Sequence, residues 1–352
     1  MGESASPRKK GLLERLASGP VICAEGYLFE CERRGYLQAG AYVPEIVLEH
    51  PEMVAQLHRE FVHAGSDVVE AFTYYAHREK LRMIQKEHLL EEMNRQALRI
   101  AKEVADESGA LLAGDLSNTN VFVPEDASRT TVRAMFDEQV GWAMEAKVDY
   151  FIAETFTYGE EGLIALEAIK ATGLPAVVTF SIHQEGTTRE GWTPAEACKR
   201  LENAGADVVG LNCGRGPRTM LPLLKEIRAA VTGYVAALPV PYRTTEAEPT
   251  FQSLRDPEEE GDSPDERAFP TGLDPFTCTR GDIARFGREA YALGVTYLGV
   301  CCGGASHHVR SLAEALGRTP PASRYTADMS KHALYGTDPR VKKEYQEYAA
   351  RL

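Results

Sequence analysis

Eight short apolar segments recur along the chain, and stretches with helical periodicity lie between many of them. The apolar segments are residues 20–26, 67–75, 110–117, 149–156, 175–183, 206–213, 233–240 and 296–302. Each is nearly continuous in Val, Ile, Leu, Ala or aromatic residues, which is typical of parallel strands covered on both faces. The pattern therefore predicts eight buried parallel strands.

Four of the intervening stretches have apolar residues at three- and four-residue spacing, which predicts amphipathic helices. They are residues 51–65, 89–109, 193–205 and 280–294. Strands and helices that alternate in this way predict an α/β fold, namely a single-domain (β/α)₈ TIM barrel. We assign residues 1–320 to the barrel.

Two segments depart from the alternation. Residues 246–272 are acidic and rich in proline, which predicts a mobile loop after the seventh strand. Residues 321–352 form a C-terminal extension and a candidate oligomer contact, and their last part, 338–352, is predicted to be a helix.

The charge of the chain limits its partners. The sequence has 39 Lys and Arg against 52 Asp and Glu, a net charge of −13. This argues against nucleic acid or an anionic membrane as a partner, since both favour a basic surface. The sequence contains no long apolar run and no apolar signal-peptide core, and its seven cysteines are dispersed. Reduced thiols and a cytoplasmic location are therefore expected.

Polar residues follow many of the predicted strands at the end where TIM barrels carry out their chemistry. The strand ends carry Glu25-Gly26, Phe72-Thr73-Tyr74-Tyr75, Asp115, Glu154, Asn212-Cys213 and Cys301-Cys302. Three cysteines, Cys213, Cys301 and Cys302, are thus expected to converge from the sixth and eighth strands. Three thiolates suit Zn²⁺ and leave one coordination position open, as in a catalytic site. The alternative is that they are small buried apolar side chains, which is how we interpret the other four cysteines.

Two cysteine motifs, GLNC at 210–213 and GVCCGG at 299–304, resemble the zinc motifs of homocysteine S-methyltransferases. Residues 33–68, 72–81 and 282–316 are also similar to this family, above all to its betaine-dependent members. The resemblance runs from about residue 10 to residue 325.

The resemblance implies roles for individual residues. Cys213, Cys301 and Cys302 match the zinc ligands, and Glu154 matches the acid that binds the amino group of homocysteine. The Glu25-Gly26 turn matches the loop whose backbone amides meet the homocysteine carboxylate. Tyr42 and Tyr75 match residues that line the methyl-donor pocket. Further candidates for substrate contact are Phe72, Thr73 and Asn212.

The implied reaction is zinc-dependent methyl transfer from glycine betaine, or a similar onium donor, to L-homocysteine, giving methionine and dimethylglycine. This would be a step of methionine biosynthesis, carried out by a homo-oligomer. Aromatic side chains bind such cations well, and aromatic residues cluster near the strand ends, although each can also be ordinary packing. They are Tyr27, Tyr42, Phe72, Tyr74, Tyr75, Phe156 and Tyr158.

Several departures from the family pattern concern the substrate side of the site. Ala24-Glu25-Gly26 stands where the family has Asp-Gly, Tyr42 replaces a Trp, and Thr155 replaces an aromatic residue. The C-terminal extension is also shorter. The alternative donors are dimethylsulfoniopropionate or another thetin, and S-methylmethionine. The alternative to an enzyme is a zinc- or thiol-binding sensor that kept the barrel without turnover.

Overall fold

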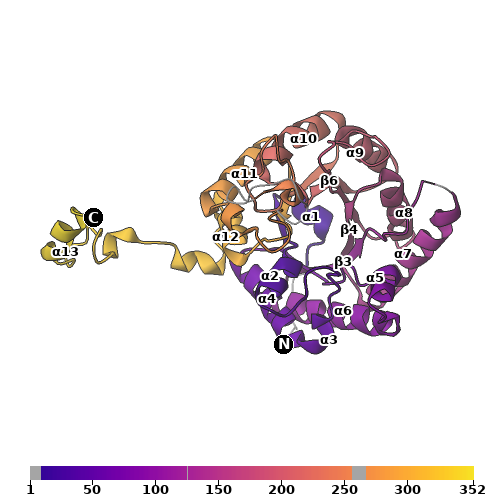
Figure 1. Cartoon of the computed structure of the whole chain (residues 1–352), viewed down its shortest axis with the longest axis horizontal. Helices are drawn as coiled ribbons and strands as arrows, with labels where there is room; N and C mark the ends of the chain where they lie inside the picture. Colours follow the sequence, from indigo (N-terminus) through magenta and orange to yellow (C-terminus); the bar gives the residue numbers. More distant parts are fainter. Residues whose placement is uncertain (1–8, 125, 256–266) are drawn as a thin grey trace, which may run out of the picture.

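The computed structural model describes residues 9–124, 126–255 and 267–352, and these form an eight-stranded barrel surrounded by helices (Figure 1). The sheet order is β1-β8-β7-β6-β5-β4-β3-β2, and all pairs are parallel. The strands are β1 Val21–Ala24, β2 Val68–Glu70, β3 Leu111–Ser117, β4 Tyr150–Phe156, β5 Ala176–Phe180, β6 Val208–Asn212, β7 Tyr234–Leu238 and β8 Tyr297–Val300. All eight predicted strands, and with them the TIM barrel, are confirmed.

Most of the helices surround the barrel, and the last one lies away from it in the C-terminal extension (Figure 1). They are α1 Leu12–Leu16, α2 Tyr27–Arg33, α3 Ile46–Glu49, α4 Pro51–Ala64, α5 Arg78–Met83, α6 Leu90–Ser108, α7 Asp126–Ala146, α8 Gly159–Lys170, α9 Pro194–Asn203, α10 Pro217–Ala230, α11 Arg280–Ala292, α12 Ser306–Ala315 and α13 Lys343–Ala349. Short 3₁₀ turns lie at Glu87–Leu89, Phe251–Ser253, Asp274–Phe276, Pro321–Tyr325 and Met329–Lys331. The four predicted helices correspond to α4, α6, α9 and α11.

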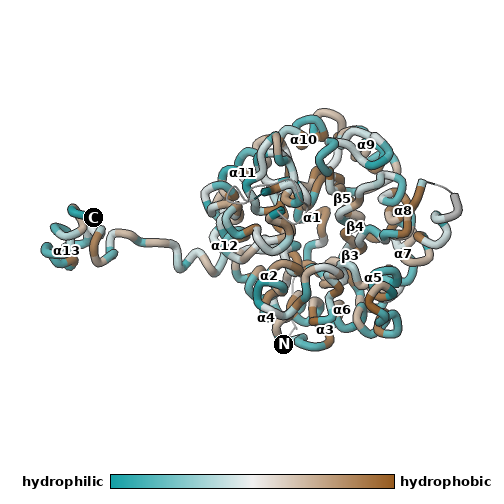
Figure 2. The backbone as a smooth tube through the Cα atoms, viewed as in Figure 1, coloured by the Kyte–Doolittle hydropathy of each residue, from teal (hydrophilic) through white to brown (hydrophobic). Residues whose placement is uncertain are grey.

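The core follows the hydropathy pattern that predicted the fold. Figure 2 shows apolar strands at the centre and more polar helix surfaces on the outside. The strand residues are buried almost without exception, because each strand has the barrel interior on one side and helices on the other. Inside the barrel, the hydroxyl groups of Tyr150 and Tyr297 are 2.8 Å apart and satisfy each other.

Three aspartates repeat one arrangement at the amino-terminal edge of the barrel. Asp67, Asp149 and Asp207 each directly precede an even-numbered strand. Each aspartate forms two hydrogen bonds of 2.7–3.0 Å with one residue of the preceding odd-numbered strand. The aspartate carboxylate accepts from the backbone N–H of that strand residue, and the aspartate N–H donates to the carbonyl of the same strand residue. Each carboxylate also pairs with a Lys or Arg. We call these arrangements the aspartate clasps.

The two segments outside the alternation differ in how they pack. The C-terminal extension runs away from the barrel after α12, and its helix α13 is shorter than the predicted 338–352 (Figure 1). The predicted mobile loop, 246–272, has buried side chains on both described flanks, including Phe251, Leu254 and Ala268. Residues 256–266 lie outside the described part of the chain.

Within the described residues, no helix has the length and apolar character needed to cross a bilayer.

Candidate active site

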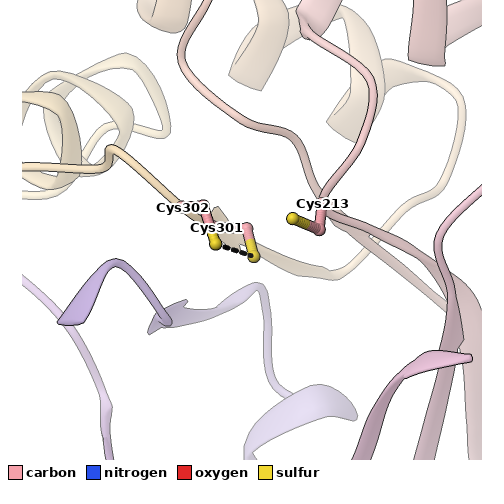
Figure 3. Close-up of side chains that lie close together, drawn as sticks. All are labelled: Cys213, Cys301 and Cys302. Carbon is pink, nitrogen blue, oxygen red and sulfur yellow. Dashed lines mark hydrogen bonds between the residues drawn. The ribbon is translucent and has the colours of Figure 1, made fainter. Parts of the chain in front are cut away.

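Three thiols meet at the carboxyl end of the barrel. Cys213 directly follows β6, and Cys301 and Cys302 directly follow β8. Their three sulfur atoms lie within 4.8 Å of one another, and those of Cys301 and Cys302 are 4.0 Å apart. Figure 3 shows the Cys213 side chain directed at the other two from the opposite side. We call these residues the thiol site. All seven cysteines of the chain are free.

The thiol site fits a zinc ion. Sulfur ligands about 2.3 Å from a tetrahedral zinc lie roughly 3.8 Å from each other, close to the spacing of Cys301 and Cys302. Hydrogen bonds from the thiols of Cys301 and Cys302 hold the pKa of Cys213 well below its usual value. Burial raises the pKa of Cys301 well above its usual value. The lowered pKa of Cys213 favours its thiolate, which is the form that coordinates zinc.

Glu154 lies on β4, and Asn212 holds it in place. The pairing of β4 with β5 shifts register between Ala153 and Phe156, which marks a bulge. Within the bulge Thr155 has a left-handed φ of 63°, and its N–H donates to Asn212 Oδ1 at 2.9 Å. The Asn212 side-chain amide donates in turn to Glu154 Oε2. Bulges beside active sites re-aim side chains in this way.

The carboxyl groups near the thiol site are buried. Burial, followed by the nearby charge of Cys213, raises the pKa of Glu154 to about 8. Burial and the proximity of Glu154 raise the pKa of Glu25 well above its usual value. Asn212 donates to Glu25 as well, at 3.3 Å, so both carboxyl groups share one amide.

Gly26 lies where the loops after β1 and β8 meet. Any side chain there would collide with the backbone carbonyl of Gly304. Gly26 is therefore required by the close approach of the two loops. It also begins α2 as its N-cap residue, which leaves amide groups at the start of that helix without partners inside the helix.

The aromatic candidates divide into two groups. The charge of Cys302 raises the pKa of Tyr42, after the larger effect of burial, and Tyr75 responds in the same way to Cys213 and Cys302. Both tyrosines have left-handed φ angles, 55° and 62°. In contrast, Phe156 is fully buried against Phe136, and Tyr158 packs on Phe122.

Two of the predicted substrate contacts have structural neighbours that limit their role. Thr73 donates its hydroxyl to the backbone carbonyl of Asp115 at 2.9 Å, so it ties β2 to β3. Phe72 is buried and packs on Tyr27, with ring centroids 5.5 Å apart.

Lys80 lies over the ring of Tyr75, with its ammonium nitrogen 3.9 Å from the centroid.

Two buried acids near the site were not among the predicted site residues. Glu70 and Asp115 line the same small cavity as Glu25, Glu154, Cys301 and Cys302. Both lie in otherwise apolar segments, VVEAF and LLAGDLS. A charged residue in a strand that is covered on both faces is unusual, and that signal could have identified them.

The fold and the site together define a class of protein: a (β/α)₈ barrel with three thiols gathered at its carboxyl edge. The sequence profile described as homocysteine S-methyltransferase matches residues 27–316. The chain therefore belongs to the homocysteine S-methyltransferase family, and the prediction of an enzyme of this kind is confirmed.

Similar proteins agree with this assignment. The chain is 39% identical to betaine–homocysteine S-methyltransferase 1 of Mus musculus over 355 residues, covering 96% of this chain and 84% of the relative. It is 36% identical to S-methylmethionine–homocysteine S-methyltransferase of Rattus norvegicus over 348 residues, covering 96% and 89%. The metallated homocysteine methyltransferase MmuM of Escherichia coli shares the fold, with a TM-score of 0.66 at 15% identity over 85% of this chain and 97% of that one.

Proposed function

We propose that this enzyme transfers a methyl group from glycine betaine to the sulfur of L-homocysteine, with zinc held by the thiol site, and releases methionine and dimethylglycine. The observation that carries the proposal is the convergence of three sulfur atoms within 4.8 Å beside the buried carboxylate of Glu154. A thiol acceptor with an amino group fits this pair of features. Cytoplasmic methionine biosynthesis is the setting that this reaction implies.

The thiol site prepares the acceptor. Zinc, when bound, lowers the pKa of a coordinated thiol, so that homocysteine is present as a thiolate at neutral pH. Cys213, Cys301 and Cys302 would supply three negative charges to a doubly charged ion, which leaves the centre with a net charge of −1. This electron-rich environment keeps the acceptor sulfur nucleophilic.

Glu154 would orient the acceptor by its ammonium group. In the free enzyme, burial holds the pKa of Glu154 at about 8. A bound ammonium group would stabilise the ionised form, and the contact is worth about 1.5–3 kcal/mol. The amide of Asn212 fixes the carboxylate. The backbone amides around Gly26 would meet the amino-acid carboxylate.

The donor would be bound by tyrosine rings. In the transfer, the acceptor sulfur forms a bond to the methyl carbon, and the donor nitrogen keeps the electron pair of the broken bond. Tyr42 and Tyr75 respond electrostatically to the thiol-site sulfurs, which supports a position near the methyl group. Glycine betaine is the first choice, a thetin such as dimethylsulfoniopropionate the second, and S-methylmethionine the third. The names of the relatives include both betaine and S-methylmethionine as donors.

The test combines metal analysis with a donor panel. Cys213→Ala, Cys301→Ala and Cys302→Ala should each lose zinc and methionine formation while the barrel stays folded by circular dichroism. Cys198→Ala is the matched control, because Cys198 is a fully buried free cysteine that lies outside the thiol site. Full zinc content in a thiol-site variant would remove that residue from the ligand set. Methionine formation from none of the donors would favour the sensor alternative.

We propose further that residues 321–352 form an oligomer contact. Several large apolar or aromatic side chains there are exposed, including Tyr325, Tyr335, Tyr348 and Leu352. Removing residues 321–352 should lower the mass measured by sedimentation equilibrium to that of a smaller assembly. An unchanged assembly would refute this role.

A further inference from the structure

One guanidinium group joins three loops at the carboxyl end of the barrel. Arg33 ends α2, the helix that follows β1. Its Nη2 donates to the hydroxyl of Tyr242, in the loop after β7, at 2.7 Å, and its Nη1 donates to the carbonyl of Gly303, after β8, at 3.4 Å. Gly303 directly follows Cys302 of the thiol site. Arg33 therefore links the loop that carries a thiol to two neighbouring loops.

The hydroxyl of Tyr242 also touches the loop after β8 directly. A Cβ atom added at Gly303 would collide with this hydroxyl. Gly303 has a left-handed φ of 84°, which glycine adopts without steric cost. The loop therefore passes over the hydroxyl with no space left for a side chain.

Tyr242 is itself firmly held. Its side chain is fully buried, and its ring stacks on Phe251, with the centroids 5.9 Å apart and the planes at 12°. Its backbone forms an antiparallel bridge with Thr277, shortly before α11. The hydroxyl therefore has little freedom to move away from Gly303.

The loop after β8 has little other support at Cys302. The N–H of Cys301 donates to the carbonyl of Pro239 at 3.0 Å. Among the described residues, neither the backbone N–H nor the carbonyl of Cys302 forms a hydrogen bond. The position of the Cys302 sulfur thus depends on the residues on either side, and on one side this is the restrained Gly303.

Ion pairs do not account for the position of Arg33. Its nearest carboxylates, those of Glu30 and Asp274, both lie 3.7 Å from its nitrogen atoms, and the side chain of Asp274 is 75% exposed. Exposed pairs of this kind contribute little to stability. The shortest polar contact of Arg33 is the one to Tyr242.

We propose that Arg33 and Tyr242 are positioning residues of the thiol site, which hold the loop after β8 so that the sulfur of Cys302 stays at ligand distance from a zinc ion. Zinc sites need ligand distances within about 0.2 Å of the ideal values. Groups that support the ligands typically contribute a factor of about 10–100 to metal affinity. The zinc ion rests on the proposed function, whereas the restraint of the loop does not.

Zinc affinity is the first measurement, by competition with a chromophoric chelator. Arg33→Met and Tyr242→Phe should each raise the Kd for zinc by at least about tenfold. Because the two residues act through one contact, the double variant should lose little more affinity than Arg33→Met alone. Cobalt(II) bound in place of zinc should show altered visible absorption bands in both variants, since these bands report coordination geometry.

Arg34→Met is the matched control. Arg34 is the next residue in the chain, and its guanidinium group pairs with Glu30 and Glu60, both at 3.0 Å. In the described part of the chain it forms no hydrogen bond to the loop after β8. The change removes an arginine and two ion pairs without releasing that loop, so the zinc Kd and the cobalt spectrum should match those of the parent protein.

The second measurement needs no metal. Hydrogen–deuterium exchange of the metal-free protein, followed by mass spectrometry, should be faster in peptides that contain residues 301–304 of Arg33→Met and Tyr242→Phe. The N–H of Gly304, which donates to the carbonyl of Cys301 at 2.8 Å, is among the amides that report this. The same peptides of Arg34→Met should exchange as in the parent.

The outcomes separate this inference from the proposed function. An unchanged zinc Kd in both variants, or a Kd raised equally by Arg34→Met, would overturn the positioning role. A lower urea midpoint with a parent-like zinc Kd and cobalt spectrum would leave Arg33 and Tyr242 with a structural role only. If the parent protein binds no zinc but the exchange changes as expected, the restraint of the loop stands and the zinc of the proposed function fails; unchanged exchange overturns the restraint as well.

Discussion

Asn212 connects the thiol site to the bulge that presents Glu154, so its removal should affect both stability and substrate binding. Asn212→Ala is the informative change. Its carbonyl oxygen accepts from the N–H of Thr155 and from the hydroxyl of Thr179, both at 2.9 Å. Its amide donates to Glu154 and, at 2.8 Å, to the hydroxyl of Thr155.

The magnitude follows from these contacts. Asn212 is fully buried, so the groups it leaves behind cannot turn to water. The two neutral bonds that the carbonyl oxygen accepts, at about 1 kcal/mol each, and the bond to Glu154, at about 1.5–3 kcal/mol, give a loss of roughly 3–5 kcal/mol. The bond to the hydroxyl of Thr155 is left out of this sum, because that hydroxyl also donates to Glu154 and keeps this partner. The left-handed backbone of Thr155 also loses its support.

The assay measures unfolding in urea and the kinetics of the variant. We expect the free energy of unfolding to fall by about 3–5 kcal/mol and the KM for homocysteine to rise by about tenfold, since Glu154 is no longer fixed. Thr179→Val is the control, because it removes one neutral bond and should lose only about 1 kcal/mol. A loss for Asn212→Ala no larger than that of Thr179→Val, or an unchanged KM, would refute the reasoning.

Three further predictions concern a buried histidine, the donor pocket and the thiol site. Burial lowers the pKa of His58 to about 3, so below pH 6.5 the histidine takes up a proton in the unfolded chain but not in the folded protein. About 2 kcal/mol of the free energy of unfolding should therefore be lost between pH 6.5 and pH 5. Urea midpoints measured at these two pH values should show a smaller loss for His58→Phe. Lys80→Ala should lower the KM for the onium donor by a few-fold, because it exposes the face of Tyr75 and removes a like charge; a higher KM would mean that Lys80 positions the ring. After zinc is removed with a chelator, mild oxidation should consume two of the three closely spaced thiols, which a thiol titration would register, while zinc-loaded protein should resist.

The fold could be predicted almost completely from the sequence. A strand buried on both faces has to be apolar throughout, so the hydropathy pattern identified all eight strands, and the parallel barrel followed from their alternation with helices. The meeting of Cys213 with Cys301 and Cys302 could be inferred too, since carboxyl ends of parallel strands share one edge. What was missed depends on side-chain direction. Glu70 and Asp115 line the small buried cavity beside the thiol site, and Asn212 donates to Glu154 next to the bulge in β4.

Backbone conformation was equally hidden from the sequence. Four residues have left-handed backbone φ angles, which residues other than glycine and asparagine rarely adopt: Tyr42, Tyr75, Thr155 and Cys213. No local sequence preference predicts this, because the surrounding structure imposes it. The flanks of 246–272 were another case, since composition indicated a mobile loop whereas Phe251 and Leu254 are packed into the protein.

The aspartate clasps imply that the barrel is assembled from two-strand modules. Each clasp joins an odd strand to the even strand after it, so chimeras with relatives should keep every clasp intact when they cross over between β2 and β3 or between β4 and β5. Crossovers between β1 and β2 or between β3 and β4 cut through one. The fourth module lacks a clasp: Thr296 occupies the aspartate position before β8, its N–H donates to Val235, and its hydroxyl is buried without a partner. Thr296 is therefore the position at which the pair β7–β8 lacks the carboxylate, and Thr296→Asp is the substitution that would supply it, on the edge of the barrel opposite the chemistry.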